Sequence, residues 1–275
     1  PAIGTDGKLL LEAPDSLALS PNGHGGSIQA LQESGALQDM ADRGIQHISY
    51  WQVDNPLVNP FEPLFLGLHA TQEADVSCRA LAKTGPFEKL GNFCVTDSKV
   101  KIIEYSDMPR GLAEARQGDG ELRFRMGSPA IHIFSRAFTE KLNQVSSFSL
   151  PFHKAVKKVP HVDGQGNPVS PEEPNAVKLE MFIFDTLPLA DQVVLLEADR
   201  KEEFAPVKNA TGTDSIESSR ELFQERCARW LENAGITVPR REDDGRLNCT
   251  LELSPRSFMD QEDVREKTDR LYKPR

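Results

Sequence analysis

Residues 20–31 read SPNGHGGSIQAL, where three glycines and a histidine precede a segment with helical periodicity. Glycine adopts positive φ angles and lets the backbone come close to a ligand. A helix that begins after such a loop offers unpaired N–H groups and the positive end of its dipole, which suit an anion such as phosphate. Asn22-Gly23 is also typical of a tight surface turn. The spacing matches neither the dinucleotide fingerprint nor the P-loop, so both interpretations stay open at this point.

The segments after this loop predict an α/β fold. Apolar residues recur at helical spacing over residues 28–40, with Gly35 as a weak point and Gly44 as the terminator. Residues 45–53 alternate and are rich in β-branched and aromatic side chains, which predicts a strand that ends at Val53. A loop, a helix and a strand in this order are typical of α/β architecture, in which ligands bind beyond the carboxyl ends of strands.

The remaining elements are predicted in the following order: a helix over 60–71; strands over 74–83, 91–97 and 100–108, the last two joined by a hairpin at Asp97-Ser98; a short strand and a helix from Ser135; a loop-rich stretch over 157–177; a strand over 192–200; and an amphipathic helix from Ser215 that ends at Gly235. We expect the core to cover residues 1–209. Residues 210–275, which include RLNCTLELSP at 246–255, would form a small C-terminal α+β subdomain.

Composition and charge narrow the class of protein. The 275 residues carry a net charge of −10, which argues against nonspecific binding to nucleic acid or to an anionic membrane. No apolar run approaches the roughly 20 residues of a membrane span. The four cysteines are widely spread without a CxxC pair, which favours reduced thiols in a cytoplasmic protein.

A few polar residues could carry phosphate chemistry. Asp54 follows the predicted strand and is a hard oxygen ligand of the kind that Mg²⁺ prefers, although Asp-Asn-Pro is equally typical of a turn. Lys178 and Lys208 could neutralise phosphate oxygens, and the alternative for each is a solvated surface lysine. Glu104 and Tyr105 could bind sugar hydroxyls, or could simply be exposed at a strand end. His24 has no second His or Cys at metal-ligand spacing.

Taken in order, several segments resemble a known family. GKLLLE, SPNGHGG, QVDNPL, IEYSDM, KKVPHVDGQGN, NAVKLEMFIFD and EEFAPVKN are similar to the eukaryotic-type UDP-sugar pyrophosphorylases, and among these to the UDP-N-acetylglucosamine enzymes most of all. Each motif is weak singly, but the resemblance extends from about Gly7 to Pro255 with the motifs in the same order.

The resemblance implies a uridylyltransferase with a Rossmann-like, GT-A-like mixed sheet flanked by helices. Such an enzyme joins UTP and a sugar 1-phosphate into UDP-sugar and pyrophosphate with Mg²⁺. Asp54 would bind the metal and the nucleotide phosphates, and Lys178 and Lys208 would neutralise phosphates. The backbone of Gly23 would hold the uracil edge, with the loop at His24 shaping the nucleoside pocket, and the sugar pocket would be lined by Gly91, Glu104, Tyr105 and Ser128.

Two residues depart from the N-acetylhexosamine pattern. His24 and Ser128 occupy positions at which those enzymes typically have asparagine, so the sugar could be glucose, galactose or an N-acetylated relative. The family's glycine-rich pyrophosphate loop, expected upstream of GKLLLE, is not among these residues. We therefore expect the 275-residue chain alone to be inactive and to need that N-terminal segment of the same protein. A noncatalytic sugar-nucleotide-binding or regulatory homologue is the alternative.

Overall fold

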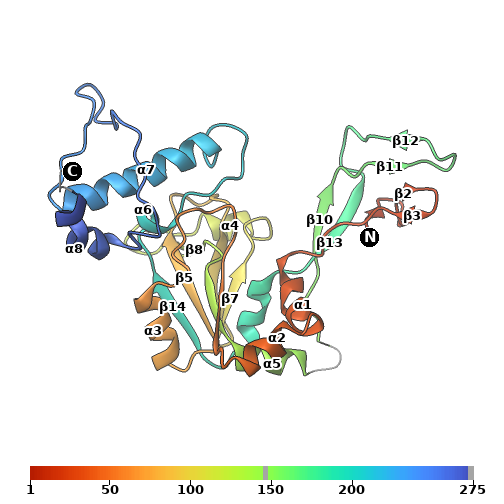
Figure 1. The fold of residues 1–275 in the computed structure, drawn as a ribbon. Coiled ribbons are helices and arrows are strands. Elements are labelled where there is room, and N and C mark those ends of the chain that lie inside the picture. Colours follow the sequence, from red (N-terminus) through yellow and green to blue (C-terminus); the bar gives the residue numbers. More distant parts are fainter. Residues whose placement is uncertain (145–147, 272–275) are drawn as a thin grey trace.

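The computed structural model describes residues 1–144 and 148–271, in which a central sheet lies between a projecting lobe and a group of C-terminal helices (Figure 1). The central sheet has seven strands in the order β4-β9-β5-β8-β6-β7, with β14 paired along β5. These strands are β4 (His47–Tyr50), β5 (Val76–Ala82), β6 (Gly91–Thr96), β7 (Lys99–Ile103), β8 (Met126–Ser128), β9 (His132–Ser135) and β14 (Val193–Glu197). The β14–β5 pair is parallel and the other pairs are antiparallel, so the predicted mixed sheet is confirmed.

Helices cover this sheet and extend the C-terminal side of the molecule. They are α1 (Ser27–Glu33), α2 (Ala36–Asp42), α3 (Pro63–Thr71), α4 (Arg110–Ala113), α5 (Arg136–Asn143), α6 (Arg200–Glu203), α7 (Ile216–Asn233) and α8 (Gln261–Leu271), with 3-10 helices η1 (His24–Gly26) and η2 (Ile183–Leu189). None of the helices in the described parts of the chain is both long and apolar enough to cross a bilayer.

The lobe projects away from the central sheet (Figure 1). Its three-stranded antiparallel sheet has the order β1-β13-β10, and two short hairpins, β2–β3 and β11–β12, accompany it. The lobe strands are β1 (Ile3–Gly4), β2 (Leu11–Ala13), β3 (Ser16–Leu17), β10 (His153–Lys157), β11 (His161–Val162), β12 (Pro168–Val169) and β13 (Ala176–Glu180).

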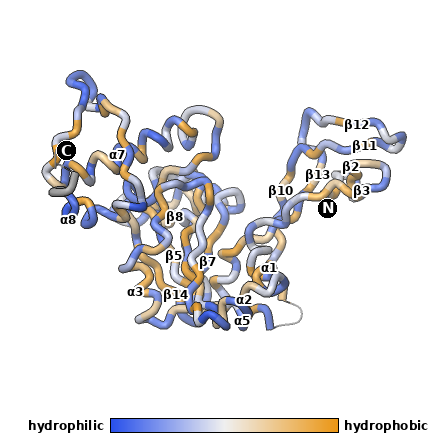
Figure 2. The backbone as a smooth tube through the Cα atoms, in the orientation of Figure 1, coloured by the Kyte–Doolittle hydropathy of each residue, from blue (hydrophilic) through white to orange (hydrophobic). Residues whose placement is uncertain are grey.

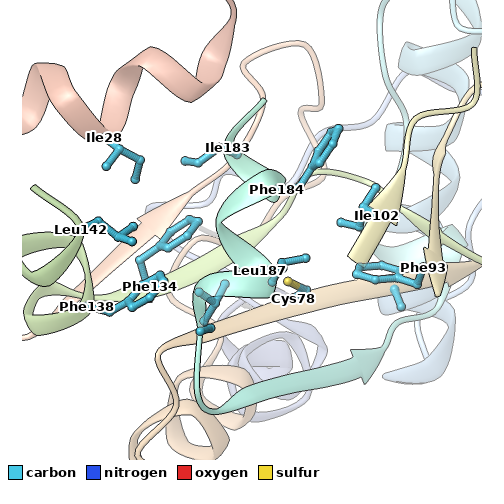
Figure 3. Packing of buried hydrophobic residues seen from close by; sticks show 13 residues of the cluster. Ile28, Cys78, Phe93, Ile102, Phe134, Phe138, Leu142, Ile183, Phe184 and Leu187 are labelled. Carbon is cyan, nitrogen blue, oxygen red and sulfur yellow. The ribbon is translucent and has the colours of Figure 1, made fainter. Parts of the chain in front are cut away.

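The main hydrophobic core lies between η2, α1, α5 and the strands β5, β6, β7 and β9. Figure 3 shows η2 between two groups of side chains, with Ile28, Phe138 and Leu142 on one side and Phe93 and Ile102 on the other. Strand β5 is buried from Val76 to Leu81, as expected for a central strand covered on both faces. This core fixes the sheet edge at which the candidate site lies.

Several local predictions are confirmed with a visible physical cause. The helix over 28–40 divides into α1 and α2 at Gly35, which has a φ of 77°. Asp97 and Ser98 both have positive φ and form the two-residue turn between β6 and β7. The Ser135 hydroxyl accepts a hydrogen bond from the Phe138 N–H at 3.1 Å and caps α5. Ser215 forms a capping box at the start of α7.

Several predictions need correction. The strand expected over 100–108 ends at Ile103, and a turn follows in which the Asp107 N–H donates to the Glu104 carbonyl at 3.0 Å. Strand β8 was not predicted. The strand expected to reach Val53 ends at Tyr50, because its partner strand begins at His132 and the preceding Ala130 has a φ of 57° that breaks the ladder. The C-terminal region was expected to be α+β, but its described residues contain α7, α8 and one isolated bridge between Arg240 and Leu247. The segment around Leu253 lies along α7, lining a groove with Cys227, instead of pairing with another strand. Residues 272–275 of that predicted subdomain lie outside the described residues.

Candidate functional site

A cavity of about 170 Å³ lies at the edge of the central sheet and is lined by seven of the nine predicted site residues. The residues come from segments far apart in the sequence: the η1 loop, the chain after β4, the start of β6, the ends of β7 and β8, η2, and the stretch before α7. The predicted residues in the lining are His24, Asp54, Gly91, Glu104, Tyr105, Ser128 and Lys208. The fold therefore brings them together as the resemblance implied.

Hydrogen bonds between two segments that are distant in sequence hold Asp54 in the cavity wall. The side chain of Asn55, which is 4 % exposed, donates to the Glu203 carbonyl at 2.8 Å and accepts from the Ala205 N–H at 3.0 Å. The Val207 N–H donates to the Asp54 carbonyl at 2.9 Å. These bonds place the segment that ends in Lys208 beside the Asp54 turn, so a cation and a carboxylate line the same cavity.

The wall formed by β6, β7 and β8 carries Gly91, Ser128 and Glu104. Gly91 and Ser128 are register partners, and a Cβ on Gly91 would lie 2.5 Å from Cγ2 of Ile102 and 3.6 Å from Oε2 of Glu104. Glycine at this position therefore keeps the backbone close to the Glu104 carboxylate. Burial raises the pKa of Glu104, and Asp107 adds to the rise, while the Lys208 cation opposes it. Glu104 is thus a carboxylate whose charge depends on nearby cations.

His24 lines the cavity in a neutral form. Its Nδ1 accepts a hydrogen bond from the Ile183 N–H at 3.1 Å, which leaves Nε2 to carry the proton. Burial lowers the pKa of His24 to about 4. The ring stacks on Phe182 with centroids 5.2 Å apart. His24 therefore offers a neutral hydrogen-bonding group at neutral pH.

Gly23, a predicted ligand of the uracil edge, is not in the cavity lining. It has a φ of 82°, and a Cβ there would lie 2.3 Å from the Met181 carbonyl oxygen. The Met181 N–H donates to the Asn22 carbonyl at 2.7 Å, and the Gly25 N–H donates to the Met181 carbonyl at 2.8 Å. The glycine loop thus allows a close approach between two backbone segments at the base of the lobe.

Lys178, the other predicted residue outside the lining, lies in the lobe. It occupies β13 opposite Ala155 of β10, whereas Lys208 reaches the cavity from the stretch before α7. The structure therefore separates the two lysines that the resemblance assigned to phosphate.

Sequence reasoning missed other residues of the lining. These are Gln52, Asn55, Lys89, Leu90, Pro129, Ala130, Phe184, Phe204 and Pro206. Five of them, Gln52, Asn55, Phe184, Phe204 and Pro206, fall inside the quoted motifs, so their proximity to predicted residues was a usable signal. Lys89 has no such signal, because it follows a turn and lies outside every motif.

The donor set around Asp54 fits a magnesium ion that is shared with phosphate. Within residues 1–144 and 148–271, no three His, Cys, Asp or Glu side chains are grouped to hold a metal. Mg²⁺ is commonly bound by one or two carboxylates, with phosphate oxygens and water completing its coordination. Asp54 lines a cavity together with the Gln52 amide and is suited to that kind of shared site.

Comparison with known proteins finds relatives with clear sequence similarity. The chain is 38% identical over 237 residues to the human UDP-N-acetylhexosamine pyrophosphorylase-like protein 1, covering 86% of this chain and 47% of that protein. It is 36% identical over 245 residues to the UDP-N-acetylglucosamine pyrophosphorylase of Saccharomyces cerevisiae, covering 86% and 51% of the two chains. The chain thus spans about half the length of these curated relatives.

A solved structure shares the fold across this chain. The uridine diphosphate N-acetylglucosamine pyrophosphorylase of Trypanosoma brucei, solved with an inhibitor, superposes with a TM-score of 0.80 at 25% identity, covering 100% of this chain and 58% of that one. The fold is therefore the nucleotidyltransferase-like fold of UDP-sugar pyrophosphorylases. The family described as UTP–glucose-1-phosphate uridylyltransferase matches residues 1–273, and the chain belongs to that family.

Proposed function

We propose that the cavity binds a UDP-sugar, and that the protein is a uridylyltransferase that makes UDP-sugar and pyrophosphate from UTP and a sugar 1-phosphate. The observation that carries this proposal is the cavity itself, in which Asp54, Lys208 and Glu104 meet from three separate segments. The family membership and the similarity to pyrophosphorylases support it.

The reaction is an in-line displacement at phosphorus. A phosphate oxygen of the sugar 1-phosphate attacks the α-phosphorus of UTP, a P–O bond forms, and the bond to pyrophosphate breaks. Such a transfer needs positioning and charge neutralisation more than a covalent nucleophile. Lys208 would neutralise phosphate oxygens as charge moves to the leaving pyrophosphate, and Asp54 would hold the metal. A bound Mg²⁺ would supply Lewis-acid stabilisation of the phosphates.

The other cavity residues would select the nucleoside and the sugar. Neutral His24 could hydrogen-bond the ligand without adding charge. The Glu104 carboxylate could accept hydrogen bonds from sugar hydroxyls, and Tyr105 and Ser128 could add hydroxyl contacts. Gly91 lets the Ile102 side chain pack against the backbone of β6, 2.5 Å from where a Cβ would lie, in the wall that carries Glu104. Glucose, galactose and their N-acetylated relatives are the candidates that a panel of ligands must separate.

Ligand binding to the chain tests this proposal first, since the chain spans about half the length of its relatives. We would measure by calorimetry the affinity for UDP and for UDP-glucose, UDP-galactose, UDP-N-acetylglucosamine and UDP-N-acetylgalactosamine, with and without Mg²⁺. Pyrophosphate release from UTP and each sugar 1-phosphate is the parallel assay. Absence of binding by all of these ligands would contradict the proposal. Lack of turnover by the 275-residue chain alone would not, because the chain spans about half the length of its relatives. In a protein that spans the full length of those relatives, binding without turnover would favour a noncatalytic homologue.

The two separated lysines provide a matched pair of variants. We expect Lys208→Ala to weaken UDP-sugar binding about tenfold, the order of one charge-assisted hydrogen bond. Lys178→Ala removes the same charge from the lobe and is expected to change the affinity less than about twofold. Equal losses in the two variants would show that the cavity is not the phosphate site.

We further propose a cytoplasmic location. Cys78, Cys94, Cys227 and Cys249 all have free thiols in the structure, as is usual in a reducing compartment.

A further inference from the structure

His153 joins the lobe to the cavity wall without lining the cavity. It is the first residue of β10, and its Nε2 lies 2.8 Å from Oδ2 of Asp185 in η2. Its Nδ1 lies 3.1 Å from Oδ2 of Asp107, in the turn after β7. A neutral imidazole carries only one N–H, so the histidine can donate both hydrogen bonds only when it is protonated. The geometry favours an imidazolium between two carboxylates.

Both carboxylates belong to segments that carry cavity residues. The Asp107 N–H donates to the Glu104 carbonyl at 3.0 Å, which closes the turn that presents Glu104 and Tyr105. Asp185 directly follows Phe184, whose side chain lines the cavity. The His153 ring also packs on Phe182, with centroids 4.6 Å apart. His153 therefore links two walls of the same cavity.

The charges around His153 are mostly negative. Asp107 and Glu104 face it from the turn after β7, Asp185 faces it from η2, and Glu180 is its register partner on β13. Burial lowers the pKa of His153, but the hydrogen bonds to Asp185 and Asp107 outweigh burial, and the pKa is raised above its ordinary value. His153 in turn opposes the rise in the pKa of Glu104.

We propose that His153 is a positioning residue for the sugar side of the site: as an imidazolium it clamps the 104–107 turn onto η2 and so fixes Glu104 and Tyr105 in the cavity wall. The role of this wall in sugar binding rests on the proposed function, whereas the clamp itself does not. Loss of the clamp lowers the affinity for ligands that carry the sugar more than it lowers the affinity for UDP.

The clamp is tested first without any ligand, by NMR on the 275-residue chain. We expect His153 to titrate above 6.5 in the wild type and closer to 6.5 in Asp107→Asn and Asp185→Asn. His153→Gln should speed hydrogen exchange at the Asp107 amide at least tenfold. His161→Gln, at another histidine of the lobe, is the control and should leave that amide unchanged. A wild-type His153 that titrates at or below 6.5, or unchanged exchange in His153→Gln, would overturn the clamp.

The second test compares two ligands, UDP and the UDP-sugar that the wild type binds best. We expect His153→Gln to lower the affinity for the UDP-sugar about tenfold and the affinity for UDP less than twofold. In the wild type the ratio of the affinity for the UDP-sugar to the affinity for UDP should fall as the pH rises through the pKa of His153. In His153→Gln this fall should be absent. Ionisation of Glu104 would act in the opposite direction, since a carboxylate gains charge as the pH rises.

The outcomes separate the two proposals. Equal loss of both ligands in His153→Gln, with the fold retained, would overturn the positioning role. Failure of the wild type to bind either ligand would contradict the proposed function, while the NMR result would still decide the clamp.

Discussion

The central sheet and the lobe are stabilised in different ways. The central core packs large side chains, among them Phe93, Phe134 and Phe138, whereas the buried cluster of the lobe consists of Ala2, Ala18, Val159 and Ala176. Figure 2 shows hydrophobic colours along β5 and β14 and hydrophilic stretches in the hairpins of the lobe. Since buried apolar area sets most of the stabilisation, the lobe depends more on its attachments to the sheet. A region of this kind opens at lower free energy than the core that carries the cavity.

The largest expected effect comes from truncating one side chain in each region. Phe138→Ala, at a site 2 % exposed, should lower the free energy of unfolding by about 4 kcal/mol. Val159→Ala, at a site 6 % exposed in the lobe, should lower it by about 1.5 kcal/mol or less. Urea unfolding gives both values, and hydrogen exchange locates the loosened amides. Faster hydrogen exchange in β5 after Val159→Ala would show that the two regions unfold as one unit. It would contradict the expectation that the lobe opens at lower free energy than the core.

The junction between the regions comes next in expected size. Gly23→Ala would place a Cβ 2.3 Å from the Met181 oxygen at a φ of 82°, so the loop or β13 must shift. We expect a loss of about 3 kcal/mol in the free energy of unfolding, the upper end of the range for a strained backbone position. Gly35→Ala is the control, because Gly35 also has a positive φ of 77° but nothing within 4 Å of the added Cβ.

Gly35→Ala should cost only about 1 kcal/mol, the penalty for a left-handed alanine. Thermal and urea unfolding of the two variants measure the difference. If both variants lose the same stability, the contact with Met181 does not constrain the loop, and the glycines serve only the turn.

The regions also differ in how far sequence reasoning reached. In the sheet, local patterns located every strand except β8, and the pairing of β8 with β6 brings Ser128 opposite Gly91. The end of β4 was misjudged because it depends on Ala130, which lies 80 residues further along and shows no local signal for its positive φ. The amide of Asn55 likewise bonds to residues near 205, a pairing that only the folded chain reveals.

The lobe shows why a motif does not place a side chain. Lys178 and Lys208 carry the same charge and both lie in motifs of the family, yet only Lys208 lines the cavity. The position of Lys178 depends on where β13 pairs with β10, outside the central sheet. Nor did any sequence pattern mark His153, since its partners Asp107 and Asp185 come from two other segments.

The smallest expected effect is a difference in pH dependence between a histidine of the sheet and the histidine at the junction. His132 is 1 % exposed, its Nδ1 contacts Cys78 Sγ at 3.1 Å, and burial lowers its pKa to about 3. In the unfolded chain the His132 imidazole is protonated as the pH falls through about 6.5, whereas in the folded chain it stays neutral. The free energy of unfolding therefore falls as the pH drops below 6.5. At pH 5 this amounts to about 2 kcal/mol.

His132→Gln should remove this loss of stability at acidic pH. The difference in unfolding free energy between wild type and variant should therefore change by about 2 kcal/mol from pH 7 to pH 5. His153 has the opposite sign: its pKa is raised, so its contribution is fully present below pH 6.5 and is lost as the pH rises through the folded pKa. His153→Gln should therefore alter the alkaline side of the stability curve. Urea unfolding from pH 5 to pH 8.5 measures both variants. If the curve of His132→Gln runs parallel to that of the wild type below pH 6.5, His132 has the same protonation state in the folded and unfolded chains. A curve of His153→Gln that runs parallel to the wild type above pH 6.5 would show the same for His153.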